Sequence, residues 1–319
     1  MPPTPRLLLW TDAPGPYAEA VAAAGLDRRV ALEPLARKEQ PSPAQLAGTE
    51  AMLAWGAAPG LLPRMPKLRW VQALTAGVEG WMALPDLPPD LALTSARGTH
   101  RESMPENILG ALFHLTKPYA AIVEDQKQRR WTRRVPAPLN GATLGILGLG
   151  AIGQEVARLA AALGMRVVGT RRGGAPLPGI AEVLPPERTE EVLAQSDFVL
   201  LLLPATPDTE NLMDARRLAM MKPGGRLLNF GRGSLVVDAD LVRAVQDGTI
   251  AGAVLDVFRR EPLPAEHPFW TTEGITVLPH IGGLHPQRDA IVARLFADNL
   301  GRFLDGRPLQ ELVDRDVGY

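Results

Sequence analysis

The stretch "ATLGILGLGAIGQEVARLAAALGMRVVGT" (residues 142–170) decides the fold of this 319-residue chain. It opens with an apolar run of strand length at 142–148, and residues 151–164 follow with helical periodicity. Residues 165–170 form a second apolar run, rich in valine. A strand, a glycine-rich turn, a helix and another strand in this order predict a parallel βαβ unit.

The same alternation continues on both sides of this unit. Further strands are predicted at 6–10, 51–55, 68–74, 91–96, 197–204, 225–230, 251–257 and 274–280. Helices are predicted at 16–25, at 101–130 and at 286–305. We therefore predict an α/β protein with two doubly wound parallel-sheet domains. Residues 106–285 form one domain, which is inserted into the other, made of residues 1–105 plus 286–319.

Composition excludes several classes of function. Apolar residues make up 46% of the chain, and the net charge of -1 gives no reason to expect nucleic acid or a membrane surface as a partner. The absence of cysteine excludes disulfides and thiolate chemistry, and the five histidines show no metal-ligand spacing. The N-terminal apolar run is too short for a signal peptide, and no run of eighteen apolar residues exists. We expect a cytoplasmic protein without metal or membrane span.

The segment "GLGAIG" (148–153) matches G-x-G-x-x-G in the context that a dinucleotide site requires. Gly148 permits the tight turn, Gly150 lets the backbone approach a pyrophosphate, and Gly153 lets helix and strand pack closely. The N-terminus of the helix offers its N–H groups to the anion. The alternative is a glycine-rich turn with a structural role only.

The end of the next strand predicts which dinucleotide is bound. An NAD site usually carries Asp or Glu here to bind the ribose 2′-OH. This strand ends in Thr170, Arg171 and Arg172, with no acid. A hydroxyl and two guanidinium groups suit a 2′-phosphate, so we expect NADP(H) to be preferred over NAD(H). The alternative is that both arginines are solvated surface charges.

Charged side chains follow the ends of three later strands. Arg232 lies between two glycines in "GGRLLNFGRGSLVVD" (224–238), Asp256 ends the next strand with Glu261 five residues later, and His280 follows a third. Ligands of doubly wound sheets bind beyond the carboxyl ends of the strands. A guanidinium can bind a carboxylate and an adjacent carbonyl, an imidazolium can supply a proton, and a carboxylate can hold the imidazole tautomer. This set suits hydride transfer to a 2-keto acid.

We interpret Arg232 as the cation that meets the negative charge of the substrate. Gly231 and Gly233 would then let the backbone approach cofactor and substrate. The alternative is a purely structural ion pair.

Together these motifs resemble the D-isomer-specific 2-hydroxyacid dehydrogenase family, and most of all its glyoxylate/hydroxypyruvate reductases. They occur in the family's order along nearly the whole chain: "GLGAIG", "LLLLPATPDTENLM" (200–213), "LLNFGRGSLVVD", "LDVFRREPLP" and "LPHIGG". The resemblance implies a Rossmann cofactor domain inserted into a flavodoxin-like substrate domain, and a homodimer.

The resemblance also implies roles for single residues. Arg232 would orient the substrate, His280 would be the acid/base, and Glu261 would be the partner of the histidine. "LTAGVEGW" (74–81) is similar to the family's carboxylate-binding loop, with backbone N–H groups at Ala76 and Gly77. Asp256 would lie near the nicotinamide carboxamide. The expected cofactor-binding residues are Gly148, Gly150, Ala151, Ile152, Gly153, Thr170, Arg171, Arg172, Pro204, Thr209, Phe230 and Asp256.

We therefore expect NADPH-preferring reduction of a small 2-keto acid, of the glyoxylate or hydroxypyruvate type, to the D-2-hydroxy acid. The alternatives are a phosphoglycerate-dehydrogenase-like enzyme and a non-enzymatic protein that senses dinucleotides. The physiological 2-keto acid stays open. So do the roles of Trp55, read as core or as cleft wall, and of His100 and Arg101, for which packing near the domain crossover is favoured over a substrate role.

Overall fold

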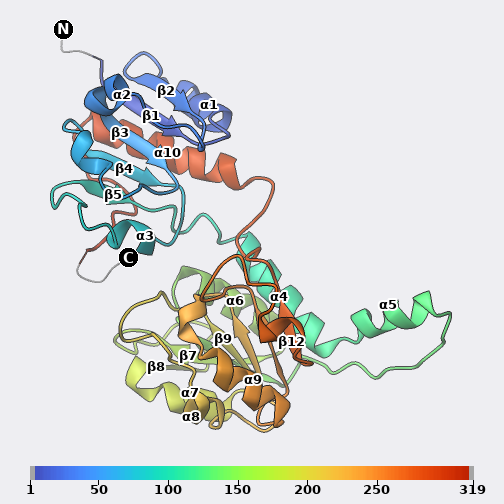
Figure 1. Cartoon of the computed structure of the whole chain (residues 1–319). Coiled ribbons are helices and arrows are strands. Elements are labelled where there is room, and N and C mark those ends of the chain that lie inside the picture. The colour runs from blue at the N-terminus through green and yellow to red at the C-terminus, as the bar shows by residue number, and fades with distance from the viewer. Residues whose placement is uncertain (1–3, 316–319) are drawn as a thin grey trace. The chain divides into compact units, whose positions relative to one another are not determined.

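The computed structural model describes residues 4–315, which form two compact units (Figure 1). The first unit combines the chain up to Thr99 with the chain from His285 onward, and the second comprises His100–Leu284. No helix among residues 4–315 is long and apolar enough to span a membrane.

The first unit contains a five-stranded sheet in the order β2-β1-β3-β4-β5, with every pair of neighbours parallel. This is the flavodoxin-like order. Its strands are β1 (Arg6–Trp10), β2 (Ala31–Leu35), β3 (Thr49–Ala54), β4 (Trp70–Ala73) and β5 (Ala92–Thr94). Its helices are α1 (Gly15–Ala23), α2 (Pro43–Gly48), α3 (Glu79–Met82) and α10 (Arg288–Leu304), with a 3-10 turn, η1, at Leu62–Arg64.

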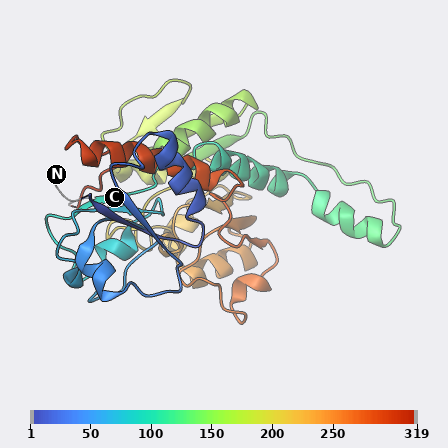
Figure 2. The same cartoon turned by 90° about the horizontal axis from the view of Figure 1, so that it is seen from above.

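Helices α1 and α10 lie side by side on one face of this sheet (Figure 2). The apolar positions of α10 recur every three or four residues and point to the core. Phe296 of α10 contacts Tyr17 of α1 edge-on, with ring centroids 6.0 Å apart, and stacks on Trp70 of β4 at 5.8 Å. The last helix of the chain is therefore part of the core of the first unit.

The second unit contains a seven-stranded parallel sheet in the order β12-β11-β10-β9-β6-β7-β8. Its strands are β6 (Thr143–Leu147), β7 (Arg166–Thr170), β8 (Glu182–Leu184), β9 (Phe198–Leu201), β10 (Arg226–Asn229), β11 (Gly252–Leu255) and β12 (Ile275–Val277). The order reverses between β6 and β9, which is the switch point where Rossmann folds bind dinucleotides. Apolar clusters cover both faces of the sheet.

The helices of the second unit are α4 (Ser103–Thr116), α5 (Tyr119–Lys127), α6 (Ala151–Ala162), α7 (Thr189–Gln195), α8 (Ala215–Leu218) and α9 (Asp238–Gln246). Its 3-10 turns are η2 (Pro186–Arg188), η3 (Gly233–Leu235) and η4 (Pro268–Trp270). Helix α5 and the chain that follows it extend away from the sheet of this unit (Figure 2).

The predicted α/β class with two doubly wound parallel sheets is confirmed, but details differ. Strands β2 and β8, which are both edge strands of their sheets, were not predicted from the sequence. The single helix predicted at 101–130 is wrong: it is interrupted at Lys117, where α4 ends, and Pro118. A proline favours an extended conformation in the residue before it, and Lys117 has φ -112° and ψ 129°.

Candidate active site

The glycine-rich turn joins β6 to α6 at the switch point of the second sheet. Gly148 has a φ of 110°, and a Cβ there would lie 2.9 Å from the carbonyl carbon of Leu202. A Cβ on Gly153 would lie 2.4 Å from the carbonyl oxygen of Gly148. Both positions therefore need glycine, one for the turn and the other for the approach of helix to strand.

Gly150 is different because its surroundings are open. Among the described residues, apart from the neighbours of Gly150 in the chain and the backbone of its helix, no atom lies within 4 Å of the position that a Cβ on Gly150 would take. Gly150 is the N-cap of α6, and Ala151 and Ile152 form the first turn. The N–H groups of this turn have no partner within the helix, so this open helix N-terminus fits a pyrophosphate.

Thr170 ends β7 beside the glycine-rich turn. Its carbonyl oxygen accepts hydrogen bonds from the N–H groups of Gly148 (3.3 Å) and Leu149 (2.9 Å). Thr170 is buried, whereas Arg171 is half-buried and Arg172 is exposed. Arg171 and Arg172 are thus closer to solvent than Thr170.

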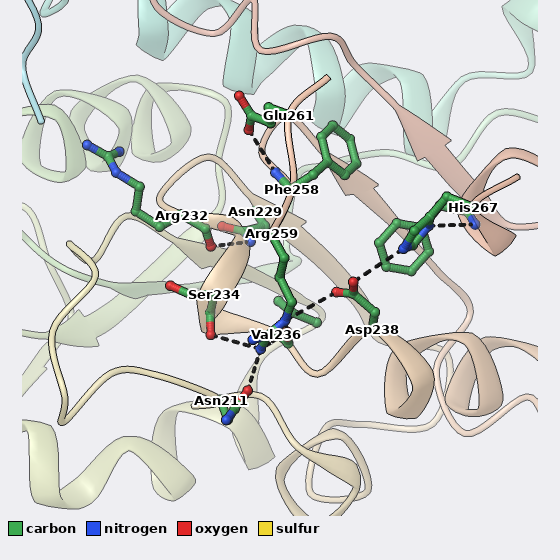
Figure 3. A network of polar contacts seen from close by, with 11 residues as sticks. Asn211, Asn229, Arg232, Ser234, Val236, Asp238, Phe258, Arg259, Glu261 and His267 are labelled. Atoms are coloured by element: carbon green, nitrogen blue, oxygen red, sulfur yellow. Dashed lines mark hydrogen bonds and ion pairs between the residues drawn. The ribbon is translucent and has the colours of Figure 1, made fainter. Parts of the chain in front are cut away.

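Arg232 lies between β10 and η3 (Figure 3). The Asn229 side chain is fully buried and donates from Nδ2 to the Arg232 carbonyl oxygen at 2.9 Å. Its Oδ1 accepts from the N–H of Gly231 at 3.1 Å. These bonds hold the backbone of Arg232 on both sides, so the side chain starts from a fixed point.

The glycines beside Arg232 have a packing role that the sequence did not reveal. A Cβ on Gly231 would lie 2.7 Å from the carbonyl oxygen of Leu203, and one on Gly233 would lie 1.9 Å from the carbonyl carbon of Phe258. The space beside both glycines is filled by the chain's own backbone. Glycine is needed there because the chain's own backbone packs against both positions, and the approach of cofactor and substrate to this segment stays a prediction.

Glu261 and His280 meet directly. Oε2 of Glu261 lies 2.6 Å from Nδ1 of His280, and Oε1 accepts from the N–H of Phe258 at 2.9 Å. The contact at Nδ1 leaves Nε2 of the imidazole for another partner, and the His280 side chain is 55% exposed. His280 also has a φ of 53°, which is uncommon outside glycine and typical of functional sites.

Asp256 holds the segment that follows His280. It directly follows β11, is 1% exposed, and accepts from the N–H groups of Ile281 (2.7 Å) and Gly282 (2.8 Å). Burial raises the pKa of Asp256 above its usual value, although both N–H groups and the nearby His280 act in the opposite direction. Both observed contacts of the Asp256 side chain are with backbone N–H groups. The expected position of Asp256 near the nicotinamide carboxamide stays a prediction.

The other predicted cofactor residues differ in their exposure. Thr209 Oγ1 donates to the Pro204 carbonyl oxygen at 2.7 Å and so closes a loop after β9. Phe230 is 3% exposed and belongs to the apolar core of the unit. Pro204 and Thr209 are therefore accessible in part, whereas Phe230 is a core residue.

The predicted carboxylate-binding loop follows β4 in the first unit. Ala76 and Gly77 are half-buried, and Thr75 Oγ1 donates to the Gly77 carbonyl oxygen at 2.6 Å. Before the loop, the Leu74 carbonyl oxygen accepts from the guanidinium of Arg288. Arg288 therefore holds the residue that directly precedes this loop.

Trp55, whose role the sequence left open, directly follows β3. Its ring contacts two guanidinium groups, those of Arg288 (4.6 Å from the ring centroid) and Arg37 (5.3 Å). Trp55 is half-buried, and its role as core or as cleft wall stays open.

His100 and Arg101 lie at the start of the second unit. The ring of His100 lies within 3.1 Å of the position that a Cβ on Gly283 would take, which fits the packing role expected for it. Arg101 lines a pocket of about 680 Å³ between α4, α6 and residues 177–180.

Two arginines that the sequence analysis did not single out make important contacts. Arg288 begins α10 and donates to the Leu74 carbonyl oxygen, while Arg259 lies two residues before Glu261 in the sequence (Figure 3). No spacing pattern marks either residue, because their partners lie in distant parts of the chain.

Comparisons with known proteins identify the class. The family model "D-isomer specific 2-hydroxyacid dehydrogenase, NAD binding domain" matches residues 109–282. Glyoxylate/hydroxypyruvate reductase A of Serratia proteamaculans (strain 568) is 31% identical over 305 residues, which cover 93% of this chain and 95% of that protein.

Two solved structures are similar over almost the whole chain. A D-isomer specific 2-hydroxyacid dehydrogenase family protein from Aeromonas salmonicida subsp. salmonicida A449 has a TM-score of 0.89 and 34% identity, covering 98% of this chain and 100% of that one. The NADPH-dependent glyoxylate/hydroxypyruvate reductase of Sinorhizobium meliloti, in complex with NADP and sulfate, has a TM-score of 0.85 and 30% identity, covering 99% and 100%.

Fold, glycine-rich turn and comparisons together define an NAD(P)-dependent oxidoreductase that uses a nicotinamide dinucleotide. The chain belongs to the D-isomer specific 2-hydroxyacid dehydrogenase family, which confirms the resemblance found in its sequence.

Proposed function

We propose that the protein reduces a small 2-keto acid, of the glyoxylate or hydroxypyruvate type, to the D-2-hydroxy acid and prefers NADPH. The observation that carries the proposal is the 2.6 Å contact between Glu261 and His280 in the unit that also holds the glycine-rich turn and Arg232. A carboxylate-bound imidazole is suited to give and take a proton at its other nitrogen.

The roles follow from the chemistry of each side chain. When bound, the dinucleotide supplies the hydride. Arg232 binds the 2-keto acid through its planar fork, which matches a carboxylate oxygen and an adjacent carbonyl oxygen. Nε2 of His280 gives a proton to the oxygen that becomes the alcohol, and Glu261 stabilises the imidazolium before this transfer. The N–H groups of Ala76 and Gly77 in the first unit would bind the substrate carboxylate.

The preference for NADPH rests on the end of β7. Arg171 and Arg172 follow Thr170 directly, and no carboxylate stands there to bind a 2′-OH. Arginine is well suited to a phosphate because it donates two parallel hydrogen bonds. The S. meliloti relative, described as NADPH-dependent, supports the same choice.

Oxidation of NADPH, followed by its absorbance, tests the proposal on a panel that contains glyoxylate, hydroxypyruvate and phosphohydroxypyruvate. We expect turnover with the first two, and much less with NADH. Turnover restricted to phosphohydroxypyruvate would favour the phosphoglycerate-dehydrogenase reading. Binding of NADPH without turnover of any 2-keto acid would favour a dinucleotide sensor. The predicted cytoplasmic location can be tested by cell fractionation.

We also propose a homodimer, in which the arm of residues 119–138 contacts a second copy of the chain. Tyr119 is 66% exposed, and Trp131 and Val135 are each more than 90% exposed, which is unusual for large apolar side chains. Light scattering should give twice the mass of the chain, and Trp131→Asp should weaken the dimer.

A further inference from the structure

Arg259 contacts two segments of the second unit that lie far from it in the sequence (Figure 3). Its Nε donates to the Val236 carbonyl oxygen at 3.0 Å, and its Nη2 donates to the carbonyl oxygens of Val236 (2.6 Å) and Ser234 (3.1 Å). Nη2 also donates to Oδ1 of Asn211. One guanidinium thus binds both the η3 turn with its C-cap, through Ser234 and Val236, and the loop that contains Asn211.

The η3 turn begins directly after Arg232, which is its N-cap. On the other side, the turn packs on the backbone next to Arg259, because a Cβ on Gly233 would lie 2.3 Å from the backbone nitrogen of Arg259. The N–H of Phe258, one residue earlier, binds Glu261. The segments that carry Arg232 and Glu261 therefore meet at Arg259.

The position of the guanidinium is itself fixed. Nε lies 3.7 Å from Oδ1 of Asp238, the residue at which α9 begins. Oδ2 of Asp238 lies 3.3 Å from Nε2 of His267, whose Nδ1 accepts from the N–H of Phe269. The Arg259 side chain is only one-third exposed, so its contacts are partly shielded from water.

We propose that Arg259 is a positioning residue, which fixes the η3 turn and thereby aims Arg232 at the 2-keto acid. This inference rests on the proposed function, since it assigns Arg259 to the same reaction. Arg259 acts through the backbone of residues 233–236 and does not touch substrate. Its planar group with several donors suits this task, because it can bind two carbonyl oxygens and an amide oxygen together.

The test uses three variants of the full chain. Arg259→Met keeps the apolar stem and removes every donor, and Arg259→Lys keeps the charge but loses the fork. Arg260→Met is the matched control, since it removes the same charge from the exposed neighbouring position. Two measurements are made on each: amide hydrogen exchange without ligand, and the kinetics of 2-keto acid reduction.

Arg259→Met should speed exchange of the Leu235 and Val236 amides by roughly tenfold, because the turn opens more often. It should lower kcat/KM for the 2-keto acid by about ten- to a hundredfold, with a higher KM and a lower kcat, because Arg232 is misplaced. The KM for NADPH should change less than about twofold, and the pH profile should keep its shape, since Arg259 does not contact the Glu261–His280 pair. Arg259→Lys should recover part of the loss.

Unchanged exchange at Leu235 and Val236 in Arg259→Met would overturn the proposal. An equal kinetic loss in Arg260→Met would also overturn it, because the effect would then come from net charge. Faster exchange of these amides with normal kinetics would mean that Arg259 only stabilises the turn, and it would also overturn the proposal. If the unmodified protein reduces no 2-keto acid, the proposed function fails, while the exchange data still decide whether Arg259 holds the turn.

Discussion

Gly231 and Gly233, on either side of Arg232, pack closely against other parts of the backbone. The sequence indicates that neither position tolerates a side chain, but glycine does not say what fills the space. In the structure, backbone atoms of Leu203 and Phe258 fill it. The backbone segment that carries Arg232 is consequently packed between two other parts of the chain, so the position from which the Arg232 side chain extends is fixed.

At this scale, Arg232→Lys tests the substrate role. Lysine keeps the charge but loses the fork, so KM for the 2-keto acid should rise and kcat should fall. The loss of a charge-assisted contact is about 2–4 kcal/mol, or roughly thirtyfold to a thousandfold in kcat/KM. Arg226→Lys, at the start of β10, is the matched control. A destabilised Arg232→Lys variant with normal kinetics would instead mean that Arg232 has only a structural role.

Glu261→Gln tests the partner of the histidine. Without the negative charge 2.6 Å from Nδ1, the imidazolium is less favoured. Reduction needs the protonated imidazole, so the alkaline fall of kcat/KM should move to lower pH; oxidation needs the neutral form, so its acidic fall should move in the same direction. Rates measured across pH in both directions check this, with exposed Glu266→Gln as the control. Identical profiles for Glu261→Gln and the unmodified protein would exclude the pairing.

At the scale of elements, the sequence predicted all the inner strands but only two of the four edge strands, β5 and β12. The central strands are continuous apolar runs, as strands covered on both faces require. The missed strand β2 contains Pro34, which an edge can tolerate because one side of the strand makes no ladder. The other missed strand, β8, has only three residues. Such segments become strands through a neighbour, which no local pattern records.

Some residues of the candidate site could be predicted from the sequence and others could not. Residues at strand ends, such as Asp256 and His280, could be placed from the sequence because topology brings strand ends together. Arg259 and Arg288 could not, since each acts through carbonyl oxygens whose positions depend on the folded chain. Motifs can reveal residues that do chemistry more readily than those that support them.

The β7 end offers a test of cofactor choice. Arg171→Asp should raise the KM for NADPH by roughly tenfold or more, because a charged contact becomes a repulsion. The kcat should change less, since the 2′-phosphate is remote from the hydride. Kinetics with both dinucleotides measure this, and Arg166→Asp, at the other end of β7, is the control. Equal efficiency of the unmodified enzyme with NADPH and NADH would contradict the assignment.

At the scale of the whole molecule, the chain passes from the first unit into the second and back again, after Thr99 and after Leu284. Everything expected to bind the dinucleotide lies within His100–Leu284. The two sheets have separate apolar cores. A dinucleotide should therefore act first on the stability of one unit.

NADPH at about a hundred times its Kd should stabilise the unit that binds it by about 2.7 kcal/mol. Calorimetry should show a transition that moves to higher temperature with NADPH and moves less with the same concentration of NADH. Hydrogen exchange should slow within residues 100–284 in particular. Equal shifts with the two dinucleotides would count against the NADPH preference.

The stacking of Phe296 on Trp70 has a consequence for biosynthesis. A ribosome makes β1 to β5 first, then all of His100–Leu284, and only afterwards the α10 helix that completes the first core. The nascent first unit must therefore wait, with Tyr17 and Trp70 lacking their aromatic partner, while the second unit can already fold behind it. The first unit therefore completes its core last, although most of it is translated first. Until α10 is made, the apolar face that α10 will cover stays exposed, and chaperones can bind it.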